Sequence, residues 1–244
     1  MEIGIIGFGR LGQLLAKHLA KRNTVFVNDR KNKKSLVRKL NVTQVSVQEC
    51  AKKEMVLLCV PISQLEFVLQ KCKNYFKAGS LIMDTCTVKQ FPCAVMKKEI
   101  PKNCEIVGTH PLFGPDSAKT TLKNHSIVLC PVRIKKIKKV KLFFERLGLK
   151  VIIASPRKHD QDMARSVCLL HFLGKALKKL NLKKVQLSTP THQDLIKLLS
   201  IVENDSNQLF QDMHVFNLFS KKIRQNLMNE LRILDQTLNT KVIS

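Results

Sequence analysis

The most chemically suggestive segment of this sequence is the run THPLFGPDS at residues 109–117. Its histidine, His110, titrates near neutrality, so the neutral imidazole can accept a proton from an alcohol whose carbon is losing hydride. The two prolines exclude a regular helix, and an apolar strand pattern precedes the run. We therefore expect a loop at the carboxyl edge of a sheet, where open α/β folds bind their ligands.

A second signal is the glycine turn Gly7-Phe8-Gly9-Arg10-Leu11-Gly12, which follows the apolar run at residues 2–6 and precedes leucines at helical spacing. Gly7 permits the tight turn, Gly9 lets the backbone approach a pyrophosphate, and Gly12 lets the helix pack closely on the strand. In this context of strand, turn and helix, the six residues predict a dinucleotide-binding site.

The type of dinucleotide depends on Asp29 and Arg30, at the end of the next short strand and twenty positions after Gly9. A carboxylate there can bond both ribose hydroxyls and repels a 2′-phosphate, whereas a nearby arginine accommodates that phosphate. The sequence favours NAD as the cofactor, with NADP as the alternative.

The pattern of elements predicts an α/β fold with a second, helical domain. Strand candidates alternate with helical segments, which indicates a doubly wound, mostly parallel sheet of the Rossmann type. After Pro156 the strand pattern ends, and helical periodicity covers residues 160–180, 191–204 and 206–238. We expect an NAD(P)-binding domain at residues 1–155 and a smaller, all-helical substrate and dimerisation domain at residues 156–244. The strand candidates are residues 2–6, 24–27, 55–60, 80–84, 105–107, 126–130 and 150–154.

Composition excludes several classes of protein. Hydrophobic residues make up 44% of the chain and charged residues 25%, which is typical of a folded globular protein. The net charge is +25, but the lysines are spread along the chain, and one Tyr and no Trp leave little aromatic surface for stacking on bases. We therefore predict no specific nucleic-acid partner, while a positive surface would attract anionic small molecules.

The cysteines and the apolar segments bear on metals and location. Eight cysteines are scattered without a C-x-x-C pair, so we expect reduced thiols and no metal site. No stretch approaches the roughly 20 apolar residues that span a bilayer, so we expect no membrane partner. The chain begins in a strand pattern without a charged leader, and we expect a cytoplasmic protein.

Six segments, in this order and spacing, resemble the prephenate and arogenate dehydrogenases. The resemblance implies oxidative decarboxylation of a small molecule, prephenate or arogenate, with hydride transfer to NAD(P)+ in tyrosine biosynthesis. The segments are GFGRLG at 7–12, LCVPI at 58–62, DTCTVK at 84–89, GTHPLFGPDSA at 108–118, HDQDMARSVCLLHF at 159–172 and LSTPTHQDLIKLLSIVENDSNQLFQDMHVFN at 187–217.

The same resemblance implies roles for individual residues. His110 would take the proton of the ring C4 hydroxyl, Thr87 matches a family serine that orients the histidine or the substrate, and His171 matches a second family histidine. From its apolar neighbours alone, His171 fits a core histidine equally well. Further residues expected at the cofactor are Val60 and Pro61, and further residues expected at the substrate are Gly114, His159 and Ser200.

His159 and Asp160 stand at the expected domain junction, and their roles stay open. His159 is interpreted either as a helix cap or as a contact to cofactor or substrate. Asp160 is the alternative cap, because aspartate is a preferred residue at helix N-termini.

Three positions depart from the family pattern. Ser200 stands at or beside the place of an arginine that clamps the substrate side-chain carboxylate in many prephenate-specific members, and Val167 and Leu170 replace a glutamine and a threonine. A flexible ammonium group holds a carboxylate less well than a guanidinium does. We therefore predict weak discrimination between prephenate and arogenate. Candidates for the missing charge, each also interpreted as a solvated surface group, are Lys89, Lys119, Arg165, His192 and Lys197.

Helical residues 206–238 carry more apolar side chains than a small bundle needs, which predicts a homodimer through the second domain. Two other functions stay open. A different β-hydroxyacid-type dehydrogenase would need a catalytic lysine, for which Lys175 or Lys178 is available. A dinucleotide-binding sensor or nucleic-acid-associated protein that has lost catalysis would explain the altered residues Val167, Leu170 and Ser200.

Overall fold

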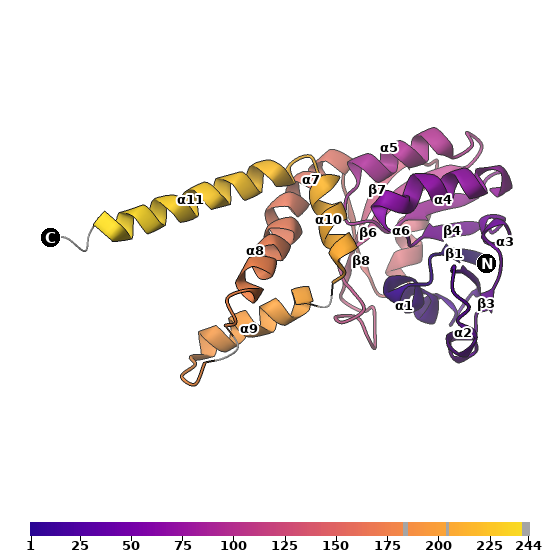
Figure 1. The fold of residues 1–244 in the computed structure, drawn as a ribbon. Helices are drawn as coiled ribbons and strands as arrows, with labels where there is room; N and C mark the ends of the chain where they lie inside the picture. Colours follow the sequence, from indigo (N-terminus) through magenta and orange to yellow (C-terminus); the bar gives the residue numbers. More distant parts are fainter. Residues whose placement is uncertain (183–184, 204, 241–244) are drawn as a thin grey trace. The chain divides into compact units, whose positions relative to one another are not determined.

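A computed structural model describes residues 1–182, 185–203 and 205–240 of the 244-residue chain (Figure 1). The chain divides into two compact units, Met1–His159 and Asp160–Ser244. Helix α7, Pro156–Met163, crosses this division. The two units are described in turn below.

The first unit is built on one eight-stranded sheet in the order β3-β2-β1-β4-β5-β6-β7-β8. All neighbouring strands run parallel except β6 and β7, which pair antiparallel. The prediction of a doubly wound, mostly parallel sheet is confirmed. The strands are β1 (Glu2–Ile6), β2 (Thr24–Asn28), β3 (Thr43–Gln44), β4 (Met55–Leu58), β5 (Leu81–Asp84), β6 (Glu105–Pro111), β7 (Ser126–Arg133) and β8 (Lys150–Ile153).

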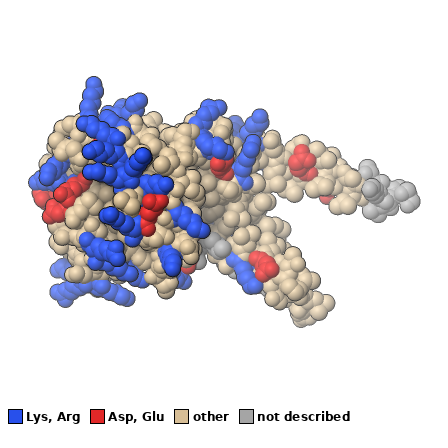
Figure 2. All heavy atoms as spheres, turned by 180° about the vertical axis from the view of Figure 1, so that it is seen from behind, with Lys and Arg blue, Asp and Glu red and all other residues tan. Residues whose placement is uncertain are grey.

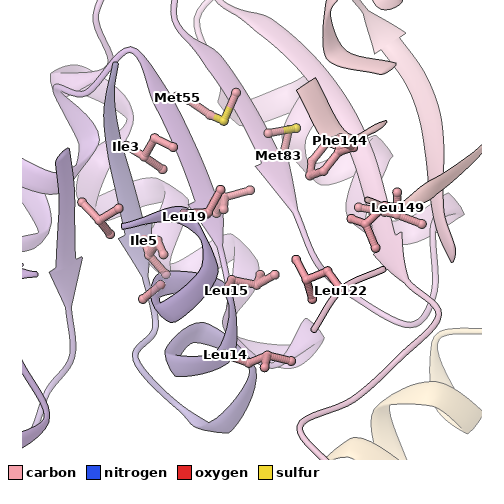
Figure 3. Close-up of a cluster of buried hydrophobic side chains, with 14 of the residues drawn as sticks. Ile3, Ile5, Leu14, Leu15, Leu19, Met55, Met83, Leu122, Phe144 and Leu149 are labelled. Carbon is pink, nitrogen blue, oxygen red and sulfur yellow. The ribbon is translucent and has the colours of Figure 1, made fainter. Parts of the chain in front are cut away.

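Helices cover both faces of this sheet, because successive strand residues point to opposite faces and both sets are apolar. One face packs against α1, α2 and α6 through a core that includes Leu15 and Phe144 (Figure 3). The other face packs against α3, α4 and α5 through a second core that includes Leu69 and Met96. The helices are α1 (Arg10–Leu19), α2 (Lys34–Leu40), α3 (Val47–Ala51), α4 (Leu65–Cys72), α5 (Gln90–Glu99) and α6 (Ile137–Glu145), with short 3-10 turns at Ile62–Gln64 and Lys73–Tyr75.

Strand β6 is longer than the sequence predicted. It continues through Thr109 and His110 to Pro111, so these residues are not in a loop as expected. The reason is the antiparallel partner β7, in which Val128 lies opposite His110. The expected loop begins only after Pro111. The two-residue edge strand β3 was not predicted, because two residues are too few to show an alternating pattern.

The second unit is helical, and no strand occurs among its described residues. The helical periodicity predicted over residues 206–238 is divided between two helices, because the chain leaves the helix after Val215 and turns at Asn217. The Asn217 side chain donates to the carbonyl of Asp160 at 2.9 Å and accepts from the Phe219 N–H at 2.9 Å. After α7 and a π-helical stretch at Ala164–Cys168, the helices are α8 (Leu169–Lys178), α9 (Pro190–Glu203), α10 (Asn207–Val215) and α11 (Ser220–Thr240).

The cap at the start of α7 also differs from the prediction. Ser155 precedes the helix, and its hydroxyl accepts the Lys158 N–H at 3.2 Å, as an N-cap serine does. His159 and Asp160 therefore lie inside the helix, and neither is its cap.

None of the described helices has the length and apolar character needed to cross a membrane. In the described part of the chain, no group of three or more His, Cys, Asp or Glu residues is placed to hold a metal ion.

Candidate functional site

The glycine turn forms a cradle at the carboxyl end of β1. Gly7 has a φ of +101°, and a Cβ there would lie 2.2 Å from the Cys59 carbonyl oxygen. A Cβ on Gly12 would lie 2.1 Å from the Gly7 carbonyl oxygen, so strand and helix leave no room for a side chain. At Gly9, in contrast, a Cβ would meet nothing within 4 Å. The open space therefore lies over Gly9, at the N-terminus of α1.

This cradle fits a pyrophosphate group. Gly9 is the N-cap of α1 and supplies no side-chain hydrogen bond to the first turn, which contains no acidic residue. The first N–H groups of a helix have no partner within the helix, so these groups and the positive end of the helix dipole suit an anion. Val60, which with Pro61 follows β4, comes within 3.1 Å of the position of a Cβ on Gly7 and so borders the cradle. The residues predicted to bind the dinucleotide pyrophosphate thus lie together.

The carboxylate of Asp29 lies at the end of β2 and already has partners. Lys33 Nζ lies 2.8 Å from Asp29 Oδ2, and the Lys31 N–H donates to Oδ1 at 2.9 Å. Burial alone would raise the pKa of Asp29, but these hydrogen bonds and the charge of Lys33 outweigh it and lower the pKa. Sequence reasoning missed Lys33 as a partner of Asp29, because a spacing of four residues signals an ion pair only within a helix and both residues precede α2.

His110 lies at the end of β6, on the edge of the sheet where β1, β4 and β5 also end. It is 6% exposed, and its Nδ1 lies 2.9 Å from Nε2 of His159, whose ring meets it edge-on. Burial, the neighbouring His159 and the charge of Lys89 lower the pKa of His110 well below its usual range. His110 is therefore neutral at neutral pH and able to accept a proton.

Thr87 has a different environment from the one expected. The ring of His110 bonds His159, and the Thr87 hydroxyl is buried with no hydrogen-bond partner in residues 1–182, 185–203 or 205–240. The expected orientation of His110 by Thr87 is therefore not seen.

A buried ion pair lies behind His110. Asp84, the last residue of β5, and Lys89 are both fully buried and bonded to each other. Lys89 also donates to the Thr109 carbonyl at 2.6 Å, and the Thr109 N–H donates to Asp84 Oδ1 at 3.1 Å. Burial alone would lower the pKa of Lys89, but the charge of Asp84, the neighbouring Cys86 and Cys93 and the hydrogen bond to Asp84 together outweigh it and raise the pKa.

These bonds fix the backbone of the residue before His110 and place a positive charge near its ring. The expectation that Lys89 is a candidate for the missing substrate-binding charge or a solvated surface group is wrong, because its ammonium is buried and engaged.

The loop that follows β6 lies along α1 and contacts both of its ends. Arg10, the first residue of α1, donates to both carboxylate oxygens of Asp116 at 2.7 and 2.8 Å. Lys17 donates to the carbonyl of Lys119 at 2.8 Å. Phe113 is buried under the loop. The loop and the glycine turn, 106 residues apart at this ion pair, are thus neighbours.

Gly114 lies at the start of this loop and stabilises its turn. Its N–H donates to the Ser117 hydroxyl at 3.0 Å, and its carbonyl accepts the Ala118 N–H at 3.1 Å. The predicted substrate residue Gly114 therefore shapes the loop that begins after His110.

In the second unit, His171 is buried and paired with an acid. Its Nε2 lies 3.5 Å from Asp205 Oδ2, and its Nδ1 has no hydrogen-bond partner among the described residues. Burial lowers the pKa of His171. The negative charge of Asp205 opposes this shift, and the positive charge of Lys175 adds to it. Ser200 is exposed on α9 and donates to the Lys197 carbonyl at 2.6 Å.

The second unit also contains a hollow of about 490 Å³ beside α11 that sequence reasoning missed. Arg224 in its wall bonds His214 Nδ1 at 2.8 Å and lies over the Phe172 ring. Burial and the charge of Arg224 lower the pKa of His214 to about 4. The lining residues are Phe172, Lys221, Arg224, Gln225, Met228, Asn229 and Arg232.

The first unit therefore places the glycine turn and Val60 at the same end of the parallel strands as His110 and its neighbour His159. The face of the molecule seen in Figure 2 is basic, with many Lys and Arg side chains and few Asp and Glu side chains, in keeping with the net charge of +25. Such a surface attracts anionic ligands.

Two family models match the chain. Residues 11–153 match the model described as prephenate dehydrogenase, nucleotide-binding domain. Residues 176–244 match a model described as the TYRAAT1-like C-terminal domain.

Curated relatives match along most of this chain. One is arogenate dehydrogenase 1, chloroplastic, of Arabidopsis thaliana, 31% identical over 89% of this chain and 36% of its own length. Another is a probable arogenate/prephenate dehydrogenase of Methanocaldococcus jannaschii, 27% identical over 99% of this chain and 57% of its own length. The chain thus spans less than two thirds of the length of these relatives.

Solved structures share the fold. Prephenate dehydrogenase from A. aeolicus, in complex with hydroxyphenyl propionate and NAD+, superposes with a TM-score of 0.78 at 19% identity and covers 99% of this chain and 92% of that one. Synechocystis arogenate dehydrogenase gives a TM-score of 0.74 at 20% identity, covering 100% and 94%.

Proposed function

The chain belongs to the prephenate/arogenate dehydrogenase family, and from that membership we propose that it oxidatively decarboxylates arogenate or prephenate with hydride transfer to a nicotinamide dinucleotide. The observation that carries the proposal is the pairing of a neutral, buried His110 with an open glycine cradle at the same edge of one sheet. A proton acceptor and a dinucleotide cradle are the two things that this reaction requires.

His110 is the proton acceptor in this proposal. Its Nδ1 faces His159, so Nε2 is the nitrogen that takes the proton of the ring hydroxyl. This requires the Nδ1–H of His110 to donate to Nε2 of His159, which fixes the tautomer and the orientation of the ring. Burial, the neighbouring His159 and the positive charge of Lys89 together keep His110 unprotonated before substrate binds, because each of them disfavours the imidazolium form.

The bound nicotinamide supplies the hydride acceptor. The hydride leaves the carbon that carries the hydroxyl. The ring carboxylate leaves as CO2, and the electrons of the broken carbon–carbon bond stay in the ring and make it aromatic. The Gly7–Gly12 turn would hold the pyrophosphate, with Val60 and Pro61 beside it. The A. aeolicus protein binds NAD+, which supports NAD as a cofactor for this chain.

Arogenate is the substrate favoured by the names of two relatives, the Arabidopsis thaliana arogenate dehydrogenases at 31% and 28% identity. Ser200 offers no charge for the side-chain carboxylate of either substrate, since it is an exposed hydroxyl bonded to Lys197. Weak discrimination between arogenate and prephenate stays the prediction, and His171 stays a predicted substrate-binding and catalytic residue.

We also propose that the protein is a homodimer through the second unit. On α11, Met228, Leu231, Leu234 and Leu238 expose between 47% and 67% of their surface at helical spacing. An apolar stripe of this kind gains free energy when a second copy covers it. Light scattering on the purified protein measures the mass directly. A cytoplasmic location stays a prediction from the sequence.

The test is reduction of NAD+ or NADP+, followed by absorbance of the reduced nicotinamide, with arogenate and with prephenate. We expect activity in the wild type and a loss of at least about a hundredfold in kcat for His110→Gln, since a positioned base contributes factors of about 10² to 10⁴. No reduction with either substrate, although the dinucleotide binds, would instead support a protein that binds the cofactor and has lost catalysis.

A further inference from the structure

The carboxylate that would select NAD over NADP is already neutralised by the protein. Asp29 Oδ2 accepts a hydrogen bond from the Lys33 ammonium at 2.8 Å, and Oδ1 accepts one from the Lys31 N–H at 2.9 Å. Only 17% of the Asp29 side chain and 21% of the Lys33 side chain are exposed, so solvent screens this pair only in part. A ribose phosphate arriving here would meet an ion pair instead of a lone negative charge.

Lys33 is held at this position by the glycine turn itself. Its Nζ donates to the Phe8 carbonyl at 2.5 Å, and the ammonium lies 5.7 Å from the centre of the Phe8 ring. Phe8 lies between Gly7 and Gly9 in the cradle. The ammonium therefore lies between the pyrophosphate cradle and the end of β2, where the adenosine ribose of a dinucleotide is bound in this fold.

The surrounding segment adds positive charge. Residues 29–34 read DRKNKK, one acid and four cations, for a net charge of +3. Arg30, Lys31 and Lys34 are exposed, so they can turn toward a ligand. A 2′-phosphate carries about two negative charges near neutral pH, and it would be attracted by this segment.

We propose that Lys33 is a specificity-determining residue that masks Asp29 and lets this chain bind NADP+ at least as tightly as NAD+. The inference rests on the proposed function, in that it assumes a dinucleotide in the glycine cradle, but it concerns the choice between two cofactors. Without Lys33, Asp29 would be free to bond the ribose hydroxyls and to repel the 2′-phosphate, and NAD+ would be preferred.

The experiment is calorimetric titration of NAD+ and NADP+ in the absence of substrate, on the wild type and on Lys33→Met. The matched control is Lys39→Met, since Lys39 is an exposed lysine in the last turn of α2, outside the segment 29–34. Thermal unfolding of each variant shows whether it is folded.

We expect comparable dissociation constants for the two dinucleotides in the wild type. Lys33→Met should weaken the binding of NADP+ about tenfold or more, as the loss of one charged contact does, and should change the binding of NAD+ much less. Lys39→Met should leave the ratio of the NADP+ and NAD+ dissociation constants unchanged. AMP and 2′,5′-ADP differ by the same 2′-phosphate, so the ratio of their dissociation constants should change in the same way, which would confine the effect to the adenosine ribose.

Two results overturn the inference and leave the proposed function standing. The first is a wild type that binds NAD+ more than about tenfold more tightly than NADP+. The second is a folded Lys33→Met protein with the same ratio of NADP+ to NAD+ dissociation constants as the wild type. Lys33 would then be only a structural link between α2 and the glycine turn. Binding of neither dinucleotide to the folded wild type would overturn the proposed function as well.

Discussion

Replacing Lys89 by methionine should destabilise this protein more than replacing almost any surface lysine. Methionine fills a similar volume without charge, so the change removes the ammonium and leaves the Asp84 carboxylate fully buried beside the apolar core. The Thr109 carbonyl also loses its donor at 2.6 Å. The variant therefore tests whether the buried pair holds β5 and β6 together beneath His110.

The magnitude follows from the burial of both groups. Removing one partner of a buried ion pair costs about 3–5 kcal/mol, because the remaining charge is uncompensated. Domains of ordinary stability unfold with about 5–15 kcal/mol, so the variant should lose a large share of its stability. Lys89→Met should also raise the pKa of His110, since the Lys89 charge contributes to lowering it.

The assay is urea unfolding of the wild type, Lys89→Met, Asp84→Asn and the double variant. We expect the double variant to recover part of the loss, because the second substitution removes the unpaired charge. Lys98→Met is the matched control, since Lys98 is an exposed lysine at the end of α5 paired with Glu66 and Glu99. Its midpoint should barely move. A loss below about 1 kcal/mol in Lys89→Met, or no recovery in the double variant, would refute the reasoning.

Two further predictions concern pH and the cradle. Because the pKa of His110 is lowered on folding, the unfolded chain takes up a proton on this residue below about pH 6.5 that the folded protein does not bind. His110 should therefore contribute a loss of stability of about 1.4 kcal/mol for each unit by which the pH falls below that value, and no change above it. Urea unfolding of wild type and His110→Gln between pH 5 and 8 checks this, and parallel curves for the two proteins would contradict it. Gly9→Ala should fold normally yet bind dinucleotide at least about tenfold more weakly, because its methyl group enters open space needed by the pyrophosphate. Gly12→Ala should lower the melting temperature instead, because its Cβ would meet the Gly7 carbonyl at 2.1 Å, and calorimetry distinguishes the two variants.

The sequence by itself determined the features that depend on neighbouring residues. The glycine turn is a local motif, since the conformation of Gly7 and the close approach at Gly12 follow from their places between a strand and a helix. The alternation of apolar strands with helices determined the sheet, and the loss of that pattern after Pro156 determined the helical unit. The six family segments were visible because their order and spacing lie in the chain itself.

Only the tertiary structure decided which distant groups meet. His110 belongs to a strand because β7, returning antiparallel, supplies the partner that a sequence pattern does not show. Lys89 looks like any surface lysine until Asp84 and the Thr109 carbonyl converge on it in the core. Lys33 likewise gains its place from the Phe8 carbonyl, 25 residues away. A charged side chain is buried only where the fold brings its partners together, because the cost of removing it from water must be met by hydrogen bonds and an opposite charge.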